Sequence, residues 1–218
     1  MEKSIAVLGL GKFGKSLARN LYELGADVLV ADGDDAVVSE FTACSTAAIC
    51  ANLNKEEEVL ALKLDQVDIA VVTMGSNLAA SILCVSVAKE KGVPLVIAKS
   101  ESNRMTSILK KVGADRVINP EEEGGARSAN ILVSNYFHDC FKLDDNLMML
   151  EMSPKEEWIG KSLDELNLRK TMNINVIALK ENDKLWNFVD PTTVLDENCL
   201  LLIAAEAATL KYIRGDKL

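Results

Sequence analysis

The six residues GLGKFG, at positions 9–14, constrain the fold of this chain more than any other part of the sequence. They directly follow the apolar run 5–8 and open a stretch, 13–24, in which apolar residues recur at helical spacing. Glycines at the first, third and sixth positions suit a tight turn, a close approach of backbone to phosphate, and close packing of helix on sheet. The motif predicts a strand–turn–helix unit that binds a nucleotide; a purely structural turn is the alternative.

The same alternation of short apolar runs and helical stretches continues to residue 120. The predicted strands span residues 5–8, 28–31, 46–50, 69–73, 95–98 and 116–118, and the predicted helices span residues 13–24, 36–41, 56–64, 77–91 and 103–112. Asn54 is predicted to cap the third of these helices. The strand cores, such as IAVL and IAVV, are continuously apolar, as in parallel strands buried on both faces. We therefore expect an α/β fold, with a doubly wound parallel, Rossmann-type sheet in a nucleotide-binding domain of residues 1–120.

The pattern changes after Pro120. Residues 121–140 are predicted to form one linking, or crossover, helix. Residues 141–218 are predicted to form a small α+β C-terminal domain. Its predicted strands are 147–152, 175–180, 185–189 and 200–204, and its predicted helices are 162–166 and 207–213.

Charge and composition exclude several classes of protein. The chain has 24 basic and 33 acidic residues, a net charge of −9, and no basic stripe, so nucleic acid is not an expected partner. The longest apolar run, 199–205, is far shorter than the about 20 residues of a membrane-spanning helix. Five scattered cysteines without CxxC spacing, and one histidine, predict reduced thiols and no zinc site.

Asp32 is the second candidate residue for nucleotide binding. It ends the second predicted strand, 21 residues after Gly11, where a carboxylate accepts hydrogen bonds from a ribose diol. A 2′-phosphate would meet like charge there, which disfavours NADP. The alternative is an ordinary helix-capping aspartate, since Asp34 and Asp35 follow.

Groups for catalysis are not evident in the sequence. A hydride-transfer enzyme usually needs an acid or base beside its substrate, but no Tyr-x-x-x-Lys occurs, and His138, the single histidine, is predicted to lie at the surface or an interface. The sequence therefore favours a binding protein over an enzyme. An NAD-dependent oxidoreductase, or an NAD(H) redox sensor on the same fold, remains as an alternative.

Four segments resemble the RCK family, the regulators of potassium conductance, and in particular the gating subunits of Trk/Ktr-type potassium uptake systems. They are IAVLGLGKFGKSLARNL, VVTMGSNLAASIL, KKVGADRVINPE and WIGKSLDELNLRKTMNINVIALK. The resemblance implies that residues 1–120 are the RCK N-terminal domain and residues 141–218 the RCK C-terminal domain.

The resemblance also implies a regulatory rather than a catalytic protein. Such subunits form homodimers that close into rings, commonly octamers, beneath an integral-membrane potassium channel or transporter subunit. The protein is expected in the cytoplasm, peripheral at the inner face of the cell membrane through that partner. ATP or ADP, or NAD(H) in some members, binds at the glycine turn, and ligand exchange changes the hinge angle of the dimer.

Residue roles follow from the family motifs. The nucleotide-binding candidates in the turn are Gly9, Gly11, Lys12, Phe13 and Gly14. Lys12 stands where many relatives have an arginine aimed at the terminal phosphate, often across the dimer, and lysine keeps the charge without the bidentate fork. Asp32 meets the ribose. Asn52, in Ala51-Asn52, stands where the family's Gly-Asp contacts adenine.

Three further candidates border the same crevice. Gly75 and Asn77 follow the fourth predicted strand, and a tight turn with a helix cap is the alternative for this pair. Lys99 follows the fifth predicted strand and is expected either to face a phosphate or to be solvated.

Two other ligands are implied by the resemblance. Glu121 matches a Pro-Glu whose carboxylate binds an activating divalent or sodium cation at the dimer interface in relatives; a carboxylate favoured by the positive end of a helix is the alternative. A second, cyclic di-AMP-like ligand is expected near Arg169, Asn175 and Pro191, for which structural roles are the alternative.

Overall fold

The computed structural model describes residues 3–181 and 184–214, and the chain divides into two compact units, Met1–Glu122 and Glu123–Leu218. Residues 1–2 of the predicted N-terminal domain, and residues 182–183 and 215–218 of the predicted C-terminal domain, lie outside the described residues. Within the described ranges, no helix has both the length and the apolar character needed to cross a lipid bilayer.

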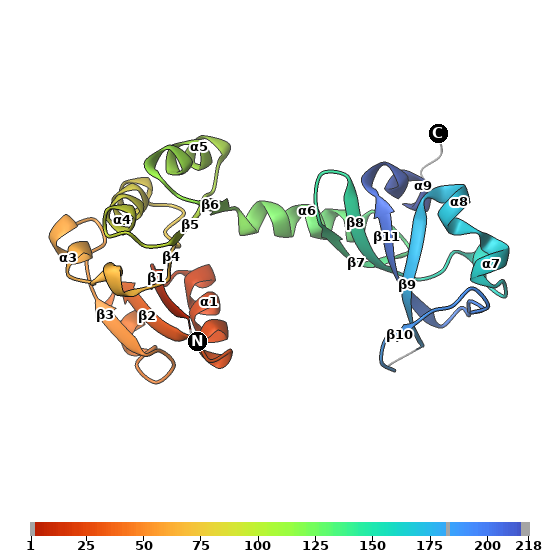
Figure 1. The fold of residues 1–218 in the computed structure, drawn as a ribbon, viewed down its shortest axis with the longest axis horizontal. Coiled ribbons are helices and arrows are strands. Elements are labelled where there is room, and N and C mark those ends of the chain that lie inside the picture. The colour runs from red at the N-terminus through yellow and green to blue at the C-terminus, as the bar shows by residue number, and fades with distance from the viewer. Residues whose placement is uncertain (1–2, 182–183, 215–218) are drawn as a thin grey trace. The chain divides into compact units, whose positions relative to one another are not determined.

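The first unit is a parallel six-stranded sheet between helices (Figure 1), in the order β3-β2-β1-β4-β5-β6. Its strands are β1 (Ser4–Leu8), β2 (Asp27–Asp32), β3 (Ala47–Cys50), β4 (Ile69–Val72), β5 (Leu95–Lys99) and β6 (Arg116–Ile118). Its helices are α1 (Lys12–Glu23), α2 (Asp35–Ser39), α3 (Glu56–Leu60), α4 (Leu78–Glu90) and α5 (Asn103–Val112). The chain runs from β1 to β3 on one side of β1 and then crosses to β4 on the other. The predicted doubly wound Rossmann-type sheet is confirmed.

Two apolar clusters cover the two faces of this sheet. Val7 packs with the apolar residues of α1 and α2, among them Ala18 and Val38. Its neighbour Leu8 belongs to the other cluster, which includes buried residues of α3, α4 and α5. Neighbouring residues of β1 therefore enter opposite cores, which explains why the strand sequence is continuously apolar.

The predicted helix 56–64 is too long, and its predicted cap is wrong. Helix α3 ends at Leu60, and Lys63 adopts the left-handed conformation (φ 53°) before the 3₁₀ turn η1 (Leu64–Gln66). The residue before the helix is Lys55, and its side chain makes no capping bond. The side-chain oxygen of Asn54 instead accepts a hydrogen bond from Asn77 at 2.9 Å.

The second unit contains an antiparallel five-stranded sheet in the order β10-β9-β11-β8-β7. Its strands are β7 (Phe137–Lys142), β8 (Leu147–Met152), β9 (Ile174–Glu181), β10 (Asn187–Phe188) and β11 (Cys199–Glu206). The short helices are η2 (Glu156–Trp158), α7 (Leu163–Leu166), α8 (Leu168–Met172), η3 (Ala207–Thr209) and α9 (Leu210–Arg214). The buried core draws on the sheet and the last helix, as Leu150, Ile203 and Ile213 show. The predicted α+β character of this part is confirmed.

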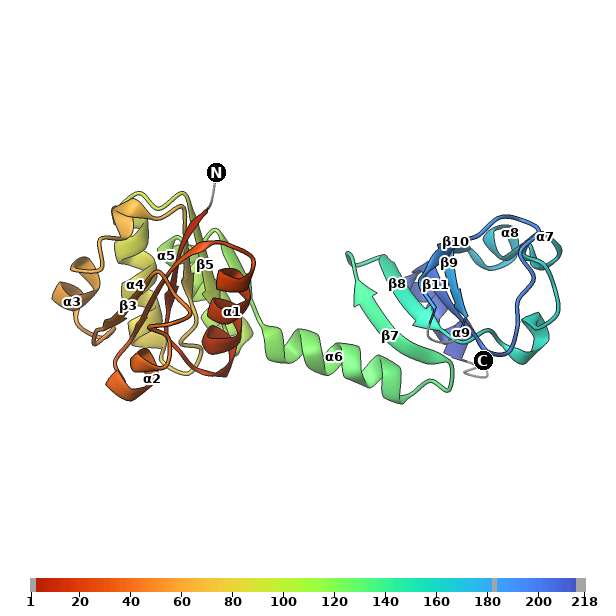
Figure 2. The ribbon, with the colours of Figure 1, turned by 90° about the horizontal axis from the view of Figure 1, so that it is seen from below.

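Helix α6 (Pro120–Leu132) is shorter than the predicted helix 121–140. The prediction failed because β7 starts at Phe137 and directs this residue and Cys140 into the core, a spacing that also fits one face of a helix. Figure 2 shows β7 beside β8, with which it pairs. Helix α8 was not predicted, and the predicted strand 185–189 shortens to the two residues of β10.

No side chain of α6 is buried. A Cβ added to Gly124 or Gly125, in the middle of the helix, would meet nothing within 4 Å. Arg127, in the second half of α6, links the helix to β7. Its Nε donates to Asp139 Oδ1 at 2.6 Å, and its guanidinium lies 4.3 Å from the centre of the Phe141 ring. Contacts of charged side chains, rather than a buried apolar face, hold this part of the helix.

Candidate functional site

Gly9 is required at its position by backbone conformation and by crowding. It lies directly after β1 with φ +101°, and its N–H donates to the carbonyl of Ala31 at 2.8 Å. A Cβ there would lie 2.6 Å from Cγ of Met74. Only glycine adopts this conformation in this space without strain.

Gly14 is required by the contact between helix and turn. A Cβ on Gly14 would lie 2.1 Å from the carbonyl oxygen of Gly9 and 2.8 Å from Oγ1 of Thr73. The buried Thr73 hydroxyl donates to the same carbonyl at 2.5 Å. Thr73 was not among the candidate site residues predicted from the sequence. Its position directly after the apolar run of β4 was the signal that could have indicated it.

Gly11 differs, because nothing in the protein requires a glycine there. Its φ of −65° and ψ of −175° suit any residue, and an added Cβ would meet no atom within 4 Å. It precedes α1, a 12-residue helix with no acidic residue in its first turn. The open space beside Gly11 therefore adjoins the positive end of a helix, an arrangement that suits a phosphate group. This is the observation that fits the predicted nucleotide to the turn.

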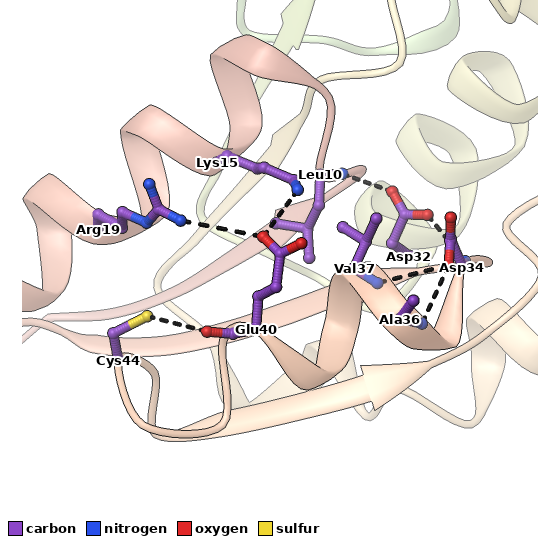
Figure 3. Close-up of polar contacts among 9 residues, drawn as sticks. All are labelled: Leu10, Lys15, Arg19, Asp32, Asp34, Ala36, Val37, Glu40 and Cys44. Carbon is purple, nitrogen blue, oxygen red and sulfur yellow. Dashed lines mark hydrogen bonds and ion pairs between the residues drawn. The ribbon is translucent and has the colours of Figure 1, made fainter.

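Asp32 joins the glycine turn to the end of β2 (Figure 3). Its Oδ2 accepts a hydrogen bond from the backbone N–H of Leu10 at 2.6 Å, and its Oδ1 accepts one from the N–H of Asp34 at 3.0 Å. The helix cap is Asp34, whose Oδ1 accepts from the N–H of Ala36 at 3.0 Å. Because each carboxylate oxygen has two lone pairs, Asp32 retains acceptor capacity for a ribose diol.

The basic residues of α1 differ in their partners. Glu40, after α2, accepts a hydrogen bond from Lys15 at 2.9 Å and lies 4.0 Å from Arg19 (Figure 3). Lys12 is exposed, and its ammonium has no ion-pair partner among residues 3–181 and 184–214. Its charge is available to a ligand. Phe13 is half-buried beside it in the first turn.

The loops after β3 and β4 are joined by asparagines. The side-chain oxygen of Asn52 accepts from the N–H of Asn54 at 3.0 Å, and the Nδ2 of Asn77 donates to the Asn54 side chain. Asn77 also caps α4, since its Oδ1 accepts from the N–H of Ala80 at 3.1 Å. The backbone N–H of Asn52 donates to Glu58 at 2.6 Å and lowers the pKa of that carboxyl, with a smaller effect from Lys55.

Lys99 is buried, so the expectation of a solvated lysine is wrong. Its Nζ lies 2.6 Å from Oε1 of Glu121 and 3.7 Å from Oε1 of Glu101. The bond from Lys99 lowers the pKa of the Glu121 carboxyl. A Cβ on Gly75, in the loop after β4, would lie 2.7 Å from Glu101 Oε1. The structure thus brings three of the candidate residues into one group.

The cation expected at Glu121 has no ready set of side-chain ligands among the described residues. Among the residues that the structure describes, no three histidine, cysteine or acidic side chains gather as metal ligands. A cation there would take its further ligands from water, from backbone carbonyls or, as the family resemblance implies, from a second chain.

The three candidates for a second ligand lie together in the second unit. Arg169, Asn175 and Pro191 line one cavity of about 360 Å³, with polar neighbours that include Asp164 and Asn167. This volume lies at the lower end of the range for small-molecule sites.

The structure places Cys84 in the core and His138 at the surface. Burial raises the pKa of the Cys84 thiol to about 12, and thiolate is the reactive form. His138 is exposed on β7, where its Nε2 lies 2.8 Å from Oγ of Ser153. The surface position predicted for His138 is confirmed.

A Rossmann-type sheet with a glycine turn, followed in the chain by an α+β unit, is also the fold of solved RCK domains. Among solved structures, a GsuK channel bound to NAD superposes with a TM-score of 0.69 at 16% identity, over 100% of this chain and 40% of that one. A GsuK structure bound to ADP superposes with a TM-score of 0.51 at 11% identity, over 62% of this chain and 36% of that one. At these identities the likeness establishes the fold.

Sequence comparison identifies the family. Residues 5–120 match the TrkA-N domain and residues 147–214 match the TrkA-C domain. Ktr system potassium uptake protein A of Vibrio alginolyticus is 33% identical over 202 residues, which cover 93% of this chain and 92% of that protein. The chain therefore belongs to the TrkA-N/TrkA-C family that includes the Ktr system potassium uptake proteins, and the resemblance seen in the sequence is confirmed.

The different surroundings of Gly14 and Gly11 predict different effects of alanine on stability. Gly14→Ala should lower the free energy of unfolding by about 1–3 kcal/mol, because its methyl group overlaps the Gly9 carbonyl. Gly11→Ala should change it by less than about 1 kcal/mol. Urea unfolding followed by circular dichroism measures both, and equal losses in the two variants would contradict the packing described here.

Proposed function

We propose that this chain is a regulatory subunit of a potassium uptake system, and that it binds an adenine nucleotide at the glycine turn without transforming it. The observation that carries the proposal is the open space beside Gly11, which adjoins the first turn of α1 and the carboxylate of Asp32. The name of the Vibrio relative supports the potassium uptake system.

The ligand that suits these residues contains an ADP moiety. The glycine turn suits a pyrophosphate, Asp32 suits a ribose diol, and the exposed Asn52 offers an amide to a base. ATP, ADP and NAD(H) all contain these parts. The ligands named for the two GsuK structures, NAD and ADP, share the same moiety.

Lys12 is our candidate for distinguishing ATP from ADP. The γ-phosphate adds negative charge, and the ammonium of Lys12 is exposed and free of ion pairs within the described ranges. A nucleotide shifts the equilibrium between two conformations only by its difference in affinity for them. In this proposal, the terminal phosphate supplies that difference.

The proposal includes an assembly and its place in the cell. Homodimers close into a ring, taken to be an octamer, on the cytoplasmic face of an integral-membrane potassium channel or transporter subunit. Residues 1–120 bind the nucleotide, and the C-terminal domain includes the five-stranded sheet that begins with β7 at Phe137. A divalent or sodium cation binds Glu121 from two chains, and a cyclic dinucleotide binds the cavity at Arg169, Asn175 and Pro191. The binding of a cyclic dinucleotide there is supported by the position of these three residues, which line the same cavity.

Nucleotide binding tests the central proposal. Isothermal titration calorimetry with ATP, ADP, NAD and NADH should show binding of at least one of them. Gly11→Ala should weaken that binding about tenfold or more, the equivalent of about 1.4 kcal/mol, because its methyl group enters the space of the phosphate. Gly124→Ala is the matched control, since its methyl group also meets no protein atom. No heat with any of the four nucleotides would disprove the proposal.

The role of Lys12 is tested by the difference between ATP and ADP. Lys12→Met should weaken ATP binding about fivefold, as expected for an exposed ion pair, and leave ADP binding nearly unchanged. Lys12→Arg should retain the preference because it keeps the charge. Competition binding at fixed ionic strength measures each affinity. Equal losses for ATP and ADP in Lys12→Met would assign Lys12 to another part of the ligand.

An oxidoreductase is the alternative function, and turnover separates it from binding. Incubation of the protein with NAD and a panel of alcohols and hydroxy acids should produce no reduced cofactor, measured by absorbance. The reason is that the sequence contains no Tyr-x-x-x-Lys and that its single histidine, His138, lies in the second unit. Turnover that Gly11→Ala abolishes would replace our proposal with an enzyme.

A further inference from the structure

Lys99 carries a charge in a place where lysine is rare. It is the last residue of β5, and its side chain is only 10% exposed. Buried lysines are paired in nearly all proteins, because removing an ammonium from water costs free energy. Here Glu121 accepts the hydrogen bond at 2.6 Å, and Glu101 lies 3.7 Å away.

The two carboxylates come from different segments at the edge of the parallel sheet. Glu121 is in the first turn of α6, and Glu101 is in the loop after β5. The Glu101 side chain also lies against the backbone of Gly75, in the loop after β4. The ammonium of Lys99 thus lies between the start of α6 and a loop that borders the glycine turn.

In the described ranges, no salt bridge other than Lys99–Glu121 joins the first turn of α6 to the sheet. The helix buries no side chain along its length. Asn119 donates to Glu122 at 2.8 Å and accepts from the backbone N–H of Glu122 at 3.3 Å, but these bonds are local. The backbone pairing of Lys99 with Ile118 ends just before the helix. The Lys99–Glu121 bond is therefore the ion pair that joins the first turn of α6 to β5.

An ordinary stabilising ion pair is the alternative, and the chain offers one for comparison. Lys89 Nζ lies 3.1 Å from both carboxylate oxygens of Asp115, between α4 and the loop before β6. This pair is in the same unit as Lys99, and neither residue belongs to α6 or to the loops at Gly75 and Glu101. It is a matched control.

We propose that Lys99 is a positioning residue, whose ammonium fixes the first turn of α6 on the carboxyl edge of the parallel sheet and links it, through Glu101, to the loop at Gly75. A nucleotide phosphate arriving at that loop competes with Glu121 for the ammonium and so loosens the first turn of α6. The second statement rests on the proposed function; the first holds without any ligand.

Hydrogen exchange of the full-length, ligand-free protein tests the first statement. Lys99→Met should accelerate exchange of the backbone amides of Glu122 and of residues 124–126 about fivefold or more, because a charge-assisted bond is lost. The first of these amides bonds to Asn119, and the others bond to carbonyls of the first turn of α6. Lys99→Arg should restore most of the protection, and Lys89→Met should leave these amides unchanged. Glu121→Gln, which keeps the shape of the side chain, should reproduce the effect of Lys99→Met and serves if that variant does not fold. Unchanged exchange in both Lys99→Met and Glu121→Gln would overturn the proposal, as would equal acceleration in Lys89→Met.

The same measurement with saturating nucleotide tests the second statement. Nucleotide should accelerate exchange at Glu122 and at residues 124–126 in the wild-type protein, and this response should be absent in Lys99→Met while calorimetry still detects binding. Binding without any response in the wild-type protein would overturn the link to the loop. Absence of binding to the wild-type protein would instead disprove the proposed function and leave the ligand-free result to decide the role of Lys99.

Discussion

The contact between the carbonyl of Gly9 and the backbone of Gly14 is the constraint on which the first unit depends. A methyl group at either glycine would collide with its surroundings, and the buried Thr73 hydroxyl donates to the same carbonyl from the neighbouring strand. The start of α1 is therefore set by β1 and β4 together, at the point where the chain crosses to the other side of the sheet. The geometry that suits a phosphate follows from this packing.

The sequence predicted the parallel sheet well because its signals are local. Continuous apolar runs and the glycine spacing need only a few neighbouring residues, and each strand that they indicated is present in the sheet. The linking helix was harder, since Phe137 and Cys140 lie on the core side of a bulged strand but also fit helical periodicity. Here the pairing of β7 with β8, which the apolar spacing of residues 121–140 does not reveal, decided the outcome.

The candidate site shows the same division between local and distant information. The positions of Gly11 and Asp32 follow from the motif that contains them. The burial of Lys99 depends on Glu121, which is 22 residues away, and on Glu101, which borders Gly75. The link between Asn54 and Asn77 joins two loops whose proximity requires the folded sheet. The sequence of one strand and its following loop could indicate these residues as candidates. It could not indicate which residues they contact.

The Gly124–Gly125 pair is expected to make the middle of α6 more flexible than that of an ordinary helix of the same length. A glycine within a helix costs about 1 kcal/mol relative to alanine, and neither glycine is required here by a turn or a close contact. Because the ion pairs of Glu121 and Arg127 lie on either side of the two glycines, we expect the middle of the helix to unwind more readily than a helix of the same length without glycine. Helix α6 is thus held by ion pairs near Glu121 and Arg127 and is expected to be more flexible between them.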